Sequence, residues 1–323
     1  MSWVLIGIPI GIILLYFGSE WMVDGAKKLA LRIGITPFAV GLTVVAMGSS
    51  SPEVITSLVS GDNPQIILGN IVGSNIANIC LAIGLAAVIS PIMCKFATVR
   101  FELLVMVFAV ALISVMALTG SLGVVEGMIL LSALVLFVIL TFKLKKGESE
   151  DNKDGRDDIE KDESHTTPLW KCLIMVIAGV AALYFGARLF IDGAVELALI
   201  FGVSDLLIGL LVVAVGTFLP ELCICLMAAY RKENEIVVSN IIGSVIFNSF
   251  FALGIAILFT TIPVTHYAIV FHMPVMVVSA IILLMMIRLG NKVSKVEGMI
   301  LITIYLAYVS AMIMFPELTQ GVI

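Results

Sequence analysis

Charged residues are scarce in this chain. Asp, Glu, Lys and Arg make up 13% of its 323 residues and hydrophobic residues 61%, against roughly 25% and 45–50% in soluble domains. Charge is absent from residues 33–52, 63–94, 103–125 and 236–287, and about 20 apolar residues suffice to cross a bilayer. The composition predicts an all-α protein that crosses a membrane many times. It excludes a soluble enzyme and a nucleic-acid-binding protein.

Several sequence signals are also missing. The five cysteines are odd in number and have no metal-ligand spacing, so we interpret them as small buried hydrophobic residues. The N-terminal MSWVLIGIPIGIILLYFG has no basic n-region and no cleavage motif, which predicts a retained first helix. The chain contains no P-loop, H-E-x-x-H or G-x-G-D pattern. We therefore expect no enzymatic activity, no ATP-driven pump and no resident cofactor.

Ten apolar segments are candidate membrane-spanning helices, at residues 2–26, 36–60, 64–91, 100–119, 122–143, 169–198, 204–230, 235–261, 268–288 and 296–315. Residues 147–167 interrupt them with nine acidic and three basic side chains and hardly any apolar ones. A segment of this composition cannot bury a core. It predicts a disordered acidic linker.

Three blocks of sequence occur twice, in the same order, on either side of this linker. LYFGSEWMVDGA (15–26) aligns without gaps on LYFGARLFIDGA (183–194), GLTVVAMGSSSPE (41–53) on GLLVVAVGTFLPE (209–221), and GNIVGSNIAN (69–78) on SNIIGSVIFN (239–248). The chain is a tandem duplication. It predicts two five-helix repeats, at residues 1–146 and 168–323.

Because five is odd, the two repeats must enter the membrane in opposite directions. If the N-terminus lies outside, 17 of the 18 Lys and Arg residues fall on the cytoplasmic side, and only Arg188 does not. Positive charge is concentrated in cytoplasmic loops. The sequence therefore predicts ten transmembrane helices in two inverted repeats, in the cell membrane, with both termini outside and the linker in the cytoplasm. Such repeats commonly form a binding site near the midplane where they meet.

Glu53 and Glu221 are the strongest candidate ligands. They occupy equivalent positions in the repeats, within predicted spans, and each follows a proline, in GSSSPE and GTFLPE. Intramembrane carboxylates are costly and mark ion pathways. Since proline lacks an N–H and displaces the carbonyl four residues back, we expect helix breaks at both prolines and freed carbonyls around residues 46–49 and 214–217. Two carboxylates with several neutral oxygens suit Ca²⁺, which takes about six to eight oxygens.

A stripe of amide and hydroxyl side chains follows in each repeat. Its three residues are spaced four apart, which places them on one helix face: Asn70, Ser74 and Asn78 in the first half, and Asn240, Ser244 and Asn248 in the second. We expect the Ser74, Asn78, Ser244 and Asn248 side chains to line an ion site. Asn70 and Asn240 fit either that role or a contact between helices.

The paired P-E motifs and paired G-S-x-x-x-N motifs resemble the two signature repeats of the calcium/cation antiporter superfamily, and most closely its sodium/calcium exchanger branch with prokaryotic members. The resemblance covers nearly the whole chain. It implies exchange of Ca²⁺ for Na⁺ by alternating access. It also implies that Glu53 and Glu221 bind Ca²⁺ together with the carbonyls of Ser49 and Thr217. The implied sodium sites add the carbonyls of Ala46 and Ala214 and the side chains of Ser50, Ser74, Asn78, Thr217, Ser244 and Asn248.

Two residues of the second half depart from the family pattern. Phe218 stands where the family usually has serine, and Asn248 where several sodium/calcium exchangers have aspartate. These departures remove a hydroxyl and a negative charge and leave the counter-ion open. The alternatives are a Ca²⁺/H⁺ antiporter, since a desolvated glutamate also binds protons, and, in a different class, a cation channel. Beyond ions and lipid the sequence indicates no partner, and a monomer is the default.

Overall fold

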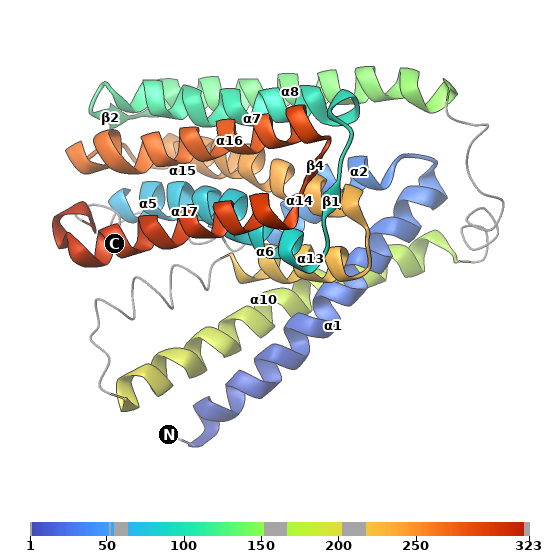
Figure 1. The fold of residues 1–323 in the computed structure, drawn as a ribbon, viewed down its shortest axis with the longest axis horizontal. Coiled ribbons are helices and arrows are strands. Elements are labelled where there is room, and N and C mark those ends of the chain that lie inside the picture. The colour runs from blue at the N-terminus through green and yellow to red at the C-terminus, as the bar shows by residue number, and fades with distance from the viewer. Residues whose placement is uncertain (1, 52, 55–63, 152–166, 202–217, 320–323) are drawn as a thin grey trace.

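The structure, a computed structural model, describes residues 2–51, 53–54, 64–151, 167–201 and 218–319. The elements of the first half are α1 (Ser2–Ile33), α2 (Pro37–Val40), η1 (Gly41–Val45), α3 (Ala46–Ser49), α5 (Pro64–Ala77), η3 (Asn78–Ala82), α6 (Ile83–Ile89), β1 (Ile92–Met93), α7 (Phe96–Ala117), β2 (Ser121–Leu122) and α8 (Val124–Asp151). Figure 1 shows how they are arranged.

The elements of the second half are α10 (Leu169–Ile200), α13 (Leu219–Tyr230), α14 (Asn234–Phe247), η5 (Asn248–Ala252), α15 (Leu253–Phe259), β3 (Ile262–Pro263), η6 (Ala268–His272), α16 (Met273–Gly290), β4 (Lys292–Val293), α17 (Lys295–Met314) and η7 (Pro316–Thr319). Within the described residues, the second half from α14 to α17 follows the order of α5 to α8 in the first half, with η6 as an additional segment. The segments η1, η3, η5 and η6 are π-helical, and η7 is a 3₁₀ helix.

The helices confirm the predicted all-α membrane fold. Within the described ranges, 8 helices are long and apolar enough to cross a membrane. Two shorter apolar helices, Pro37–Ser49 and Leu219–Tyr230, lie in the two remaining predicted spans. One boundary differs from the prediction, because α8 continues through Asp151 into the stretch assigned to the linker. Its KLKKGESED sequence is rich in Lys and Glu, which are good helix formers.

Each short β-strand of one half pairs with a strand of the other half. β1 pairs antiparallel with β4, with Ile92 opposite Val293, and β2 pairs with β3, with Leu122 opposite Ile262. Since β3 corresponds to β1 and β4 to β2 in the repeat, the two ribbons are equivalent. In Figure 1 β2 lies at the left end of the molecule and β1 and β4 toward the right. Equivalent ribbons at opposite ends are the arrangement of an inverted repeat.

Two continuous spans form the centre of the molecule. The span that runs from α5 through α6 has 78% of its most apolar window buried, and the span from α14 through α15 has 83%. The other six have 22–39% buried, as expected for helices that expose apolar side chains to lipid. These two central spans carry the predicted amide and hydroxyl stripes, so the stripes lie inside the protein.

Glycines allow the exchanged helices to touch at two equivalent crossings. A Cβ on Gly298 of α17 would lie 2.7 Å from the carbonyl oxygen of Gly84 in α6. A Cβ on Gly127 of α8 would lie 2.9 Å from the carbonyl oxygen of Gly254 in α15. Small residues permit such close approach between membrane helices. Each repeat is therefore packed against the last helix of the other.

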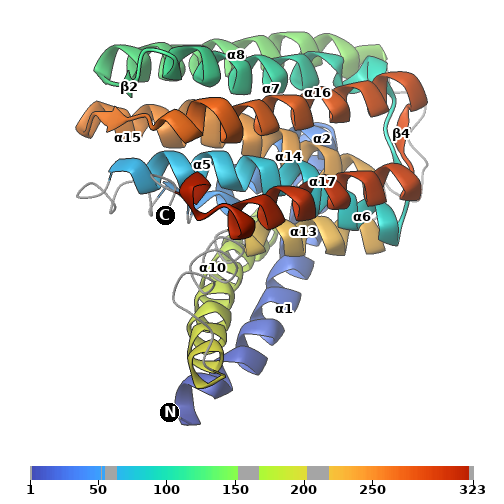
Figure 2. The same ribbon diagram turned by 60° about the vertical axis from the view of Figure 1, so that its left-hand side comes forward.

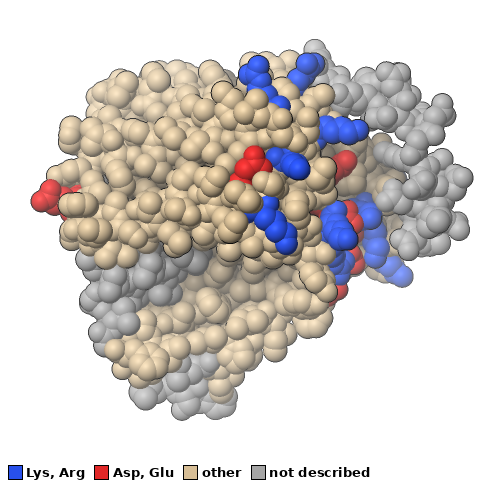
Figure 3. Space-filling view, viewed as in Figure 1, with Lys and Arg blue, Asp and Glu red and all other residues tan. Residues whose placement is uncertain are grey.

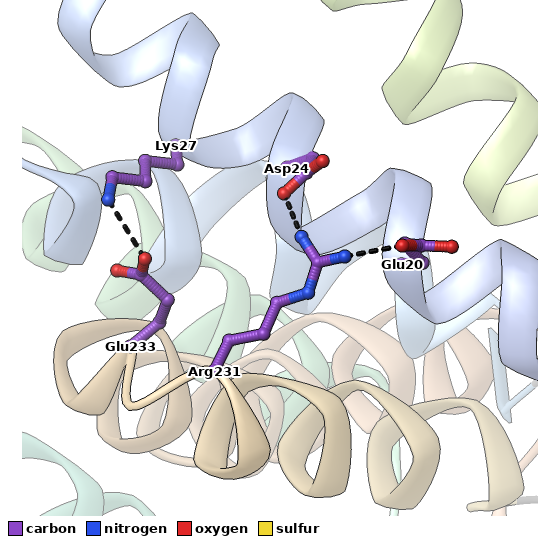
Figure 4. Close-up of polar contacts among 5 residues, drawn as sticks. All are labelled: Glu20, Asp24, Lys27, Arg231 and Glu233. Atoms are coloured by element: carbon purple, nitrogen blue, oxygen red, sulfur yellow. Dashed lines mark hydrogen bonds and ion pairs between the residues drawn. The ribbon is translucent and has the colours of Figure 1, made fainter.

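Helices α1 and α10 lie side by side and project from the rest of the bundle (Figures 1 and 2). Ion pairs join α1 to the turn after α13 (Figure 4): Arg231 contacts both Glu20 and Asp24, and the Lys27 Nζ lies 2.9 Å from Glu233 Oε1. These side chains are about one-quarter to one-third exposed. Exposed pairs contribute about 0–1 kcal/mol each, so they orient α1 more than they stabilise it.

Candidate cation site

The predicted helix breaks place both glutamates inside the bundle. α3 ends at Ser49, and Glu53 follows it. α13 begins at Leu219, with Pro220 and Glu221 in its first turn. Proline is tolerated there because a first-turn N–H has no partner within the helix. Both carboxylates are fully buried, with 0% of each residue exposed.

The two carboxylates differ in their hydrogen bonds. The Ser50 Oγ donates to Glu221 Oε1 at 2.8 Å, which joins the first repeat to the second. Among the residues that the structure describes, the other oxygen of Glu221 and both oxygens of Glu53 have no hydrogen-bond partner. Phe218 explains the difference, since it is the repeat equivalent of Ser50 and carries no hydroxyl. It is completely buried in front of α13.

Of the two equivalent hydrogen bonds that could join the stripes, only one is formed among the described residues. Asn78 is the first residue of η3 and Asn248 the first of η5, and π-helical turns are frequent at functional sites. The Asn248 Nδ2 donates to Ser74 Oγ at 3.4 Å. The equivalent contact would join Asn78 to Ser244, but both polar atoms of Asn78 and the Ser244 hydroxyl lack partners. All four residues are buried.

The carbonyl predicted to be free at Ala46 is not free. It accepts the backbone N–H of Ser50 at 3.0 Å and the Ser49 hydroxyl at 3.2 Å. The expectation of freed carbonyls was therefore wrong at this residue, because one helical turn closes before the proline. The Ser49 Oγ also contacts Asn240 Oδ1 at 3.4 Å, so Asn240 makes a contact between helices. The predicted ligands Ala214 and Thr217 lie outside the described residues.

Within the described part of the chain, six oxygens in this region are buried and have no hydrogen-bond partner: Glu53 Oε1 and Oε2, Glu221 Oε2, Asn78 Oδ1, Asn248 Oδ1 and Ser244 Oγ. They lie on or beside α3, α13, α14, η3 and η5, and among these α13 packs against α3, η3 and α14. Buried polar groups normally have partners, and an unpaired buried carboxylate is especially costly. Oxygens of this kind are the ligands of hard cations.

The described residues contain no group of three or more His, Cys, Asp or Glu side chains that could hold a metal ion. The glutamate pair and its neutral oxygens make a different kind of site. Its charge comes from two carboxylates, Glu53 and Glu221, one from each repeat.

An apolar cavity of about 490 Å³ borders this region. Residues Val176 to Tyr184 of α10 line one side, and Ser49, Ser51 and Pro220 line the other. It lies beside the segments that carry the two glutamates, at the contact between α10 and the α3 region.

Sequence reasoning missed two polar residues beside the stripes. The Asn75 Nδ2 donates to Ser249 Oγ at 3.1 Å, and both residues are completely buried. They lie off the four-residue spacing, so the stripe pattern passes over them. The signal that could have found them is their difference from their repeat equivalents, Val245 and Ile79.

Comparison with known proteins identifies relatives along nearly the whole chain. A family model described as "Sodium/calcium exchanger protein" matches residues 3–143 and 171–314. The putative antiporter CaxA of Alkalimonas amylolytica is 34% identical over 304 residues, which cover 93% of this chain and 95% of CaxA. The sodium/calcium exchanger MaX1 of Methanosarcina acetivorans is 29% identical, over 93% of this chain and 95% of MaX1.

Solved structures agree in fold. The sodium-calcium exchanger NCX_Mj, soaked with 10 mM Na⁺ and zero Ca²⁺, superimposes with a TM-score of 0.83 and 30% identity, covering 96% of this chain and 99% of that one. The same exchanger soaked with 2.5 mM Na⁺ and 0.1 mM Ca²⁺ gives a TM-score of 0.80 and 31% identity, over 94% of this chain and 97% of that one.

Proposed function

Because the chain belongs to the sodium/calcium exchanger protein family, we propose that it exchanges Ca²⁺ for Na⁺ by alternating access at a site built from both repeats. The observation that carries this proposal is the pair of buried carboxylates, one from each half, with three of their four oxygens unpartnered. Two carboxylates neutralise one Ca²⁺ or two Na⁺. The same oxygens therefore serve either cation, and binding of one excludes the other.

We assign the ligands by position. Glu53 and Glu221 bind Ca²⁺ with the carbonyls of Ser49 and Thr217. Sodium uses the same carboxylates and the further predicted groups: the carbonyls of Ala46 and Ala214 and the side chains of Ser50, Ser74, Asn78, Thr217, Ser244 and Asn248. Sodium at Ala46 must displace a hydrogen bond from that carbonyl, whereas Asn78 and Ser244 have unpartnered oxygens in place.

We also propose that the termini lie outside the cell and the acidic linker inside. The Lys and Arg side chains visible in Figure 3 gather toward the end of the molecule that carries β1 and β4 in Figure 1. Positive charge favours the cytoplasmic side. The family model matches two segments that end at 143 and resume at 171, which supports two repeats, 1–146 and 168–323, around the linker at 147–167.

Proton coupling is the second candidate, and one observation favours it. The second half lacks both the serine and the aspartate of the family pattern, at Phe218 and Asn248, which weakens a site for several Na⁺ ions. Glu53, whose carboxylate oxygens have no hydrogen-bond partner among the described residues, is then free to exchange Ca²⁺ for a proton. This candidate uses the same carboxylates and differs only in the counter-ion.

Proteoliposomes that contain no internal Ca²⁺ separate these candidates. We expect ⁴⁵Ca²⁺ uptake when Na⁺ is placed inside and removed outside, and none under an imposed pH gradient at equal Na⁺. Uptake driven only by the pH gradient would show that the counter-ion is H⁺ and not Na⁺. Flux that needs no cation on the opposite side would contradict exchange and indicate a channel.

A further inference from the structure

A second polar contact joins the repeats next to the proposed cation site. Asn75 of α5 and Ser249 of η5 are both completely buried. The Asn75 Nδ2 donates to Ser249 Oγ at 3.1 Å and lies 3.7 Å from the Met276 sulfur. The Asn75 Oδ1 has no hydrogen-bond partner among the described residues, so breaking this contact would leave the buried amide without any oxygen partner, which is costly. The contact is therefore held firmly.

Its position ties it to the site. Asn75 follows Ser74 in the sequence, and Ser249 follows Asn248, so the Asn75–Ser249 and Asn248–Ser74 contacts are formed by consecutive residues on the same two segments. Adjacent residues on a helix move together, because their backbones form one rigid turn. The first contact thus fixes the register and spacing in which the second, at 3.4 Å, can form.

The repeat provides an internal comparison. The equivalents of Asn75 and Ser249 are Val245 and Ile79, which are buried and have no polar side-chain atoms. On that side the equivalent site contact, between Asn78 and Ser244, is not formed. The half of the site with the Asn75–Ser249 contact also has the Asn248–Ser74 hydrogen bond. The half without it lacks the equivalent hydrogen bond between Asn78 and Ser244.

We propose that Asn75 and Ser249 are a positioning pair that holds Asn248 and Ser74 in place and thereby sets the Na⁺ affinity of that half of the site. This inference rests on the sodium coupling proposed above. With its Nδ2 bonded to Ser74, Asn248 keeps its Oδ1 available. The neutral amide and hydroxyl oxygens should affect the affinity for Na⁺ more than that for Ca²⁺, because the two carboxylates balance the charge of Ca²⁺.

The test is Na⁺ inhibition of Ca²⁺–Ca²⁺ exchange in proteoliposomes, an assay that needs no Na⁺ gradient. We expect Ser249→Ala to raise the half-inhibitory Na⁺ concentration about 3- to 10-fold, the range for one lost hydrogen bond. The half-saturating Ca²⁺ concentration and the maximal rate should change little. Ser249→Thr, which keeps the hydroxyl, should restore the wild-type value. The pair Asn75→Val with Ser249→Ile, which copies the apolar side, should reproduce the Ser249→Ala shift.

Ile79→Val is the matched control, since it trims the equivalent buried position and removes no hydrogen bond. It should leave Na⁺ inhibition unchanged. An unchanged Na⁺ dependence in Ser249→Ala, or equal shifts for Na⁺ and Ca²⁺, would overturn the positioning role while sodium coupling stands. A wild-type protein that Na⁺ does not inhibit would overturn sodium coupling itself, and this inference with it.

Discussion

The two halves of the site have equivalent sequence motifs and different chemistry. Glu221 accepts the Ser50 hydroxyl, whereas no hydroxyl of the described residues donates to Glu53, because Phe218 replaces the equivalent serine. Asn248 contacts Ser74, whereas their equivalents do not meet. The duplication thus places similar motifs in both halves. A few substitutions decide which of their oxygens already have a hydrogen-bond partner. The oxygens left over are the ones that need a cation.

This inequality assigns different tasks to the two glutamates. Glu221 is held in one orientation by a protein donor, so it is positioned before an ion arrives. Both oxygens of Glu53 lack a hydrogen-bond partner among the described residues and are fully buried, and a bound cation or proton relieves that cost. Glu53 is therefore the residue whose state depends most on occupancy.

The largest expected effect comes from removing either charge. Glu53→Gln or Glu221→Gln should each lower Ca²⁺ flux at least about 100-fold, since losing one member of a buried charge arrangement costs about 3–5 kcal/mol. Initial rates of ⁴⁵Ca²⁺ uptake measure this. Glu126→Gln is the control, because Glu126 only accepts the Gly123 N–H at the start of α8 and Gln keeps an acceptor. Near-normal flux in either site variant would contradict a site shared by the halves.

A second change separates the halves physically. A Cβ on Gly243 would lie 2.5 Å from the Leu42 carbonyl oxygen and 2.7 Å from the Ala46 Cβ. Gly243→Ala should therefore push α14 away from the α3 region, with a loss of about 1–3 kcal/mol of stability. The thermal unfolding temperature and the Ca²⁺ flux should both fall. Gly123→Ala, whose nearest atom would be 3.7 Å away, should change neither. Wild-type behaviour of Gly243→Ala would show that this contact is not needed.

A smaller effect should follow from making the halves more alike. Phe218→Ser with Asn248→Asp supplies Glu53 with a possible donor and adds a charge. We expect the half-maximal Na⁺ concentration for exchange to fall about tenfold, which corresponds to roughly 1.4 kcal/mol of added attraction. Phe137→Ser, at another buried phenylalanine, controls for lost volume. A folded double variant with unchanged Na⁺ dependence would contradict the roles given to both positions.

The smallest effect is expected outside both halves. Deleting residues 150–164 should change the exchange rate by less than about twofold, because the segment has almost no apolar residues with which to dock and shortening a connection alters loop entropy only slightly. The measurement is flux in a correctly inserted deletion variant. Lost activity would make the acidic stretch a regulatory element.

The sequence was sufficient to predict the membrane-spanning helices, which depend on composition averaged over about 20 residues. The uncharged run around residues 236–287 predicted a span at 235–261, and α14 to α15 occupy Asn234–Phe259. Composition and repeat spacing carry that information. The start of α13 at Leu219, one residue before Pro220, also agrees with the sequence, since proline is favoured in the first turn of a helix.

What the sequence did not predict depends on contacts between distant segments. The π-helical turns that begin at Asn78 and Asn248 differ from an α-helix by one residue, and no local pattern marks them. The Asn75–Ser249 contact joins residues 174 positions apart. At Ala46, a turn that closes before the proline decides that the carbonyl is bonded. Such features arise only when the two halves pack.

Equilibrium binding of ⁴⁵Ca²⁺ to the purified protein tests most directly whether the two halves form one cation site. Wild type and Glu126→Gln should bind one Ca²⁺ per chain, while Glu53→Gln and Glu221→Gln should bind none at a concentration that saturates wild type. Normal binding by either single variant would contradict a site shared between the halves.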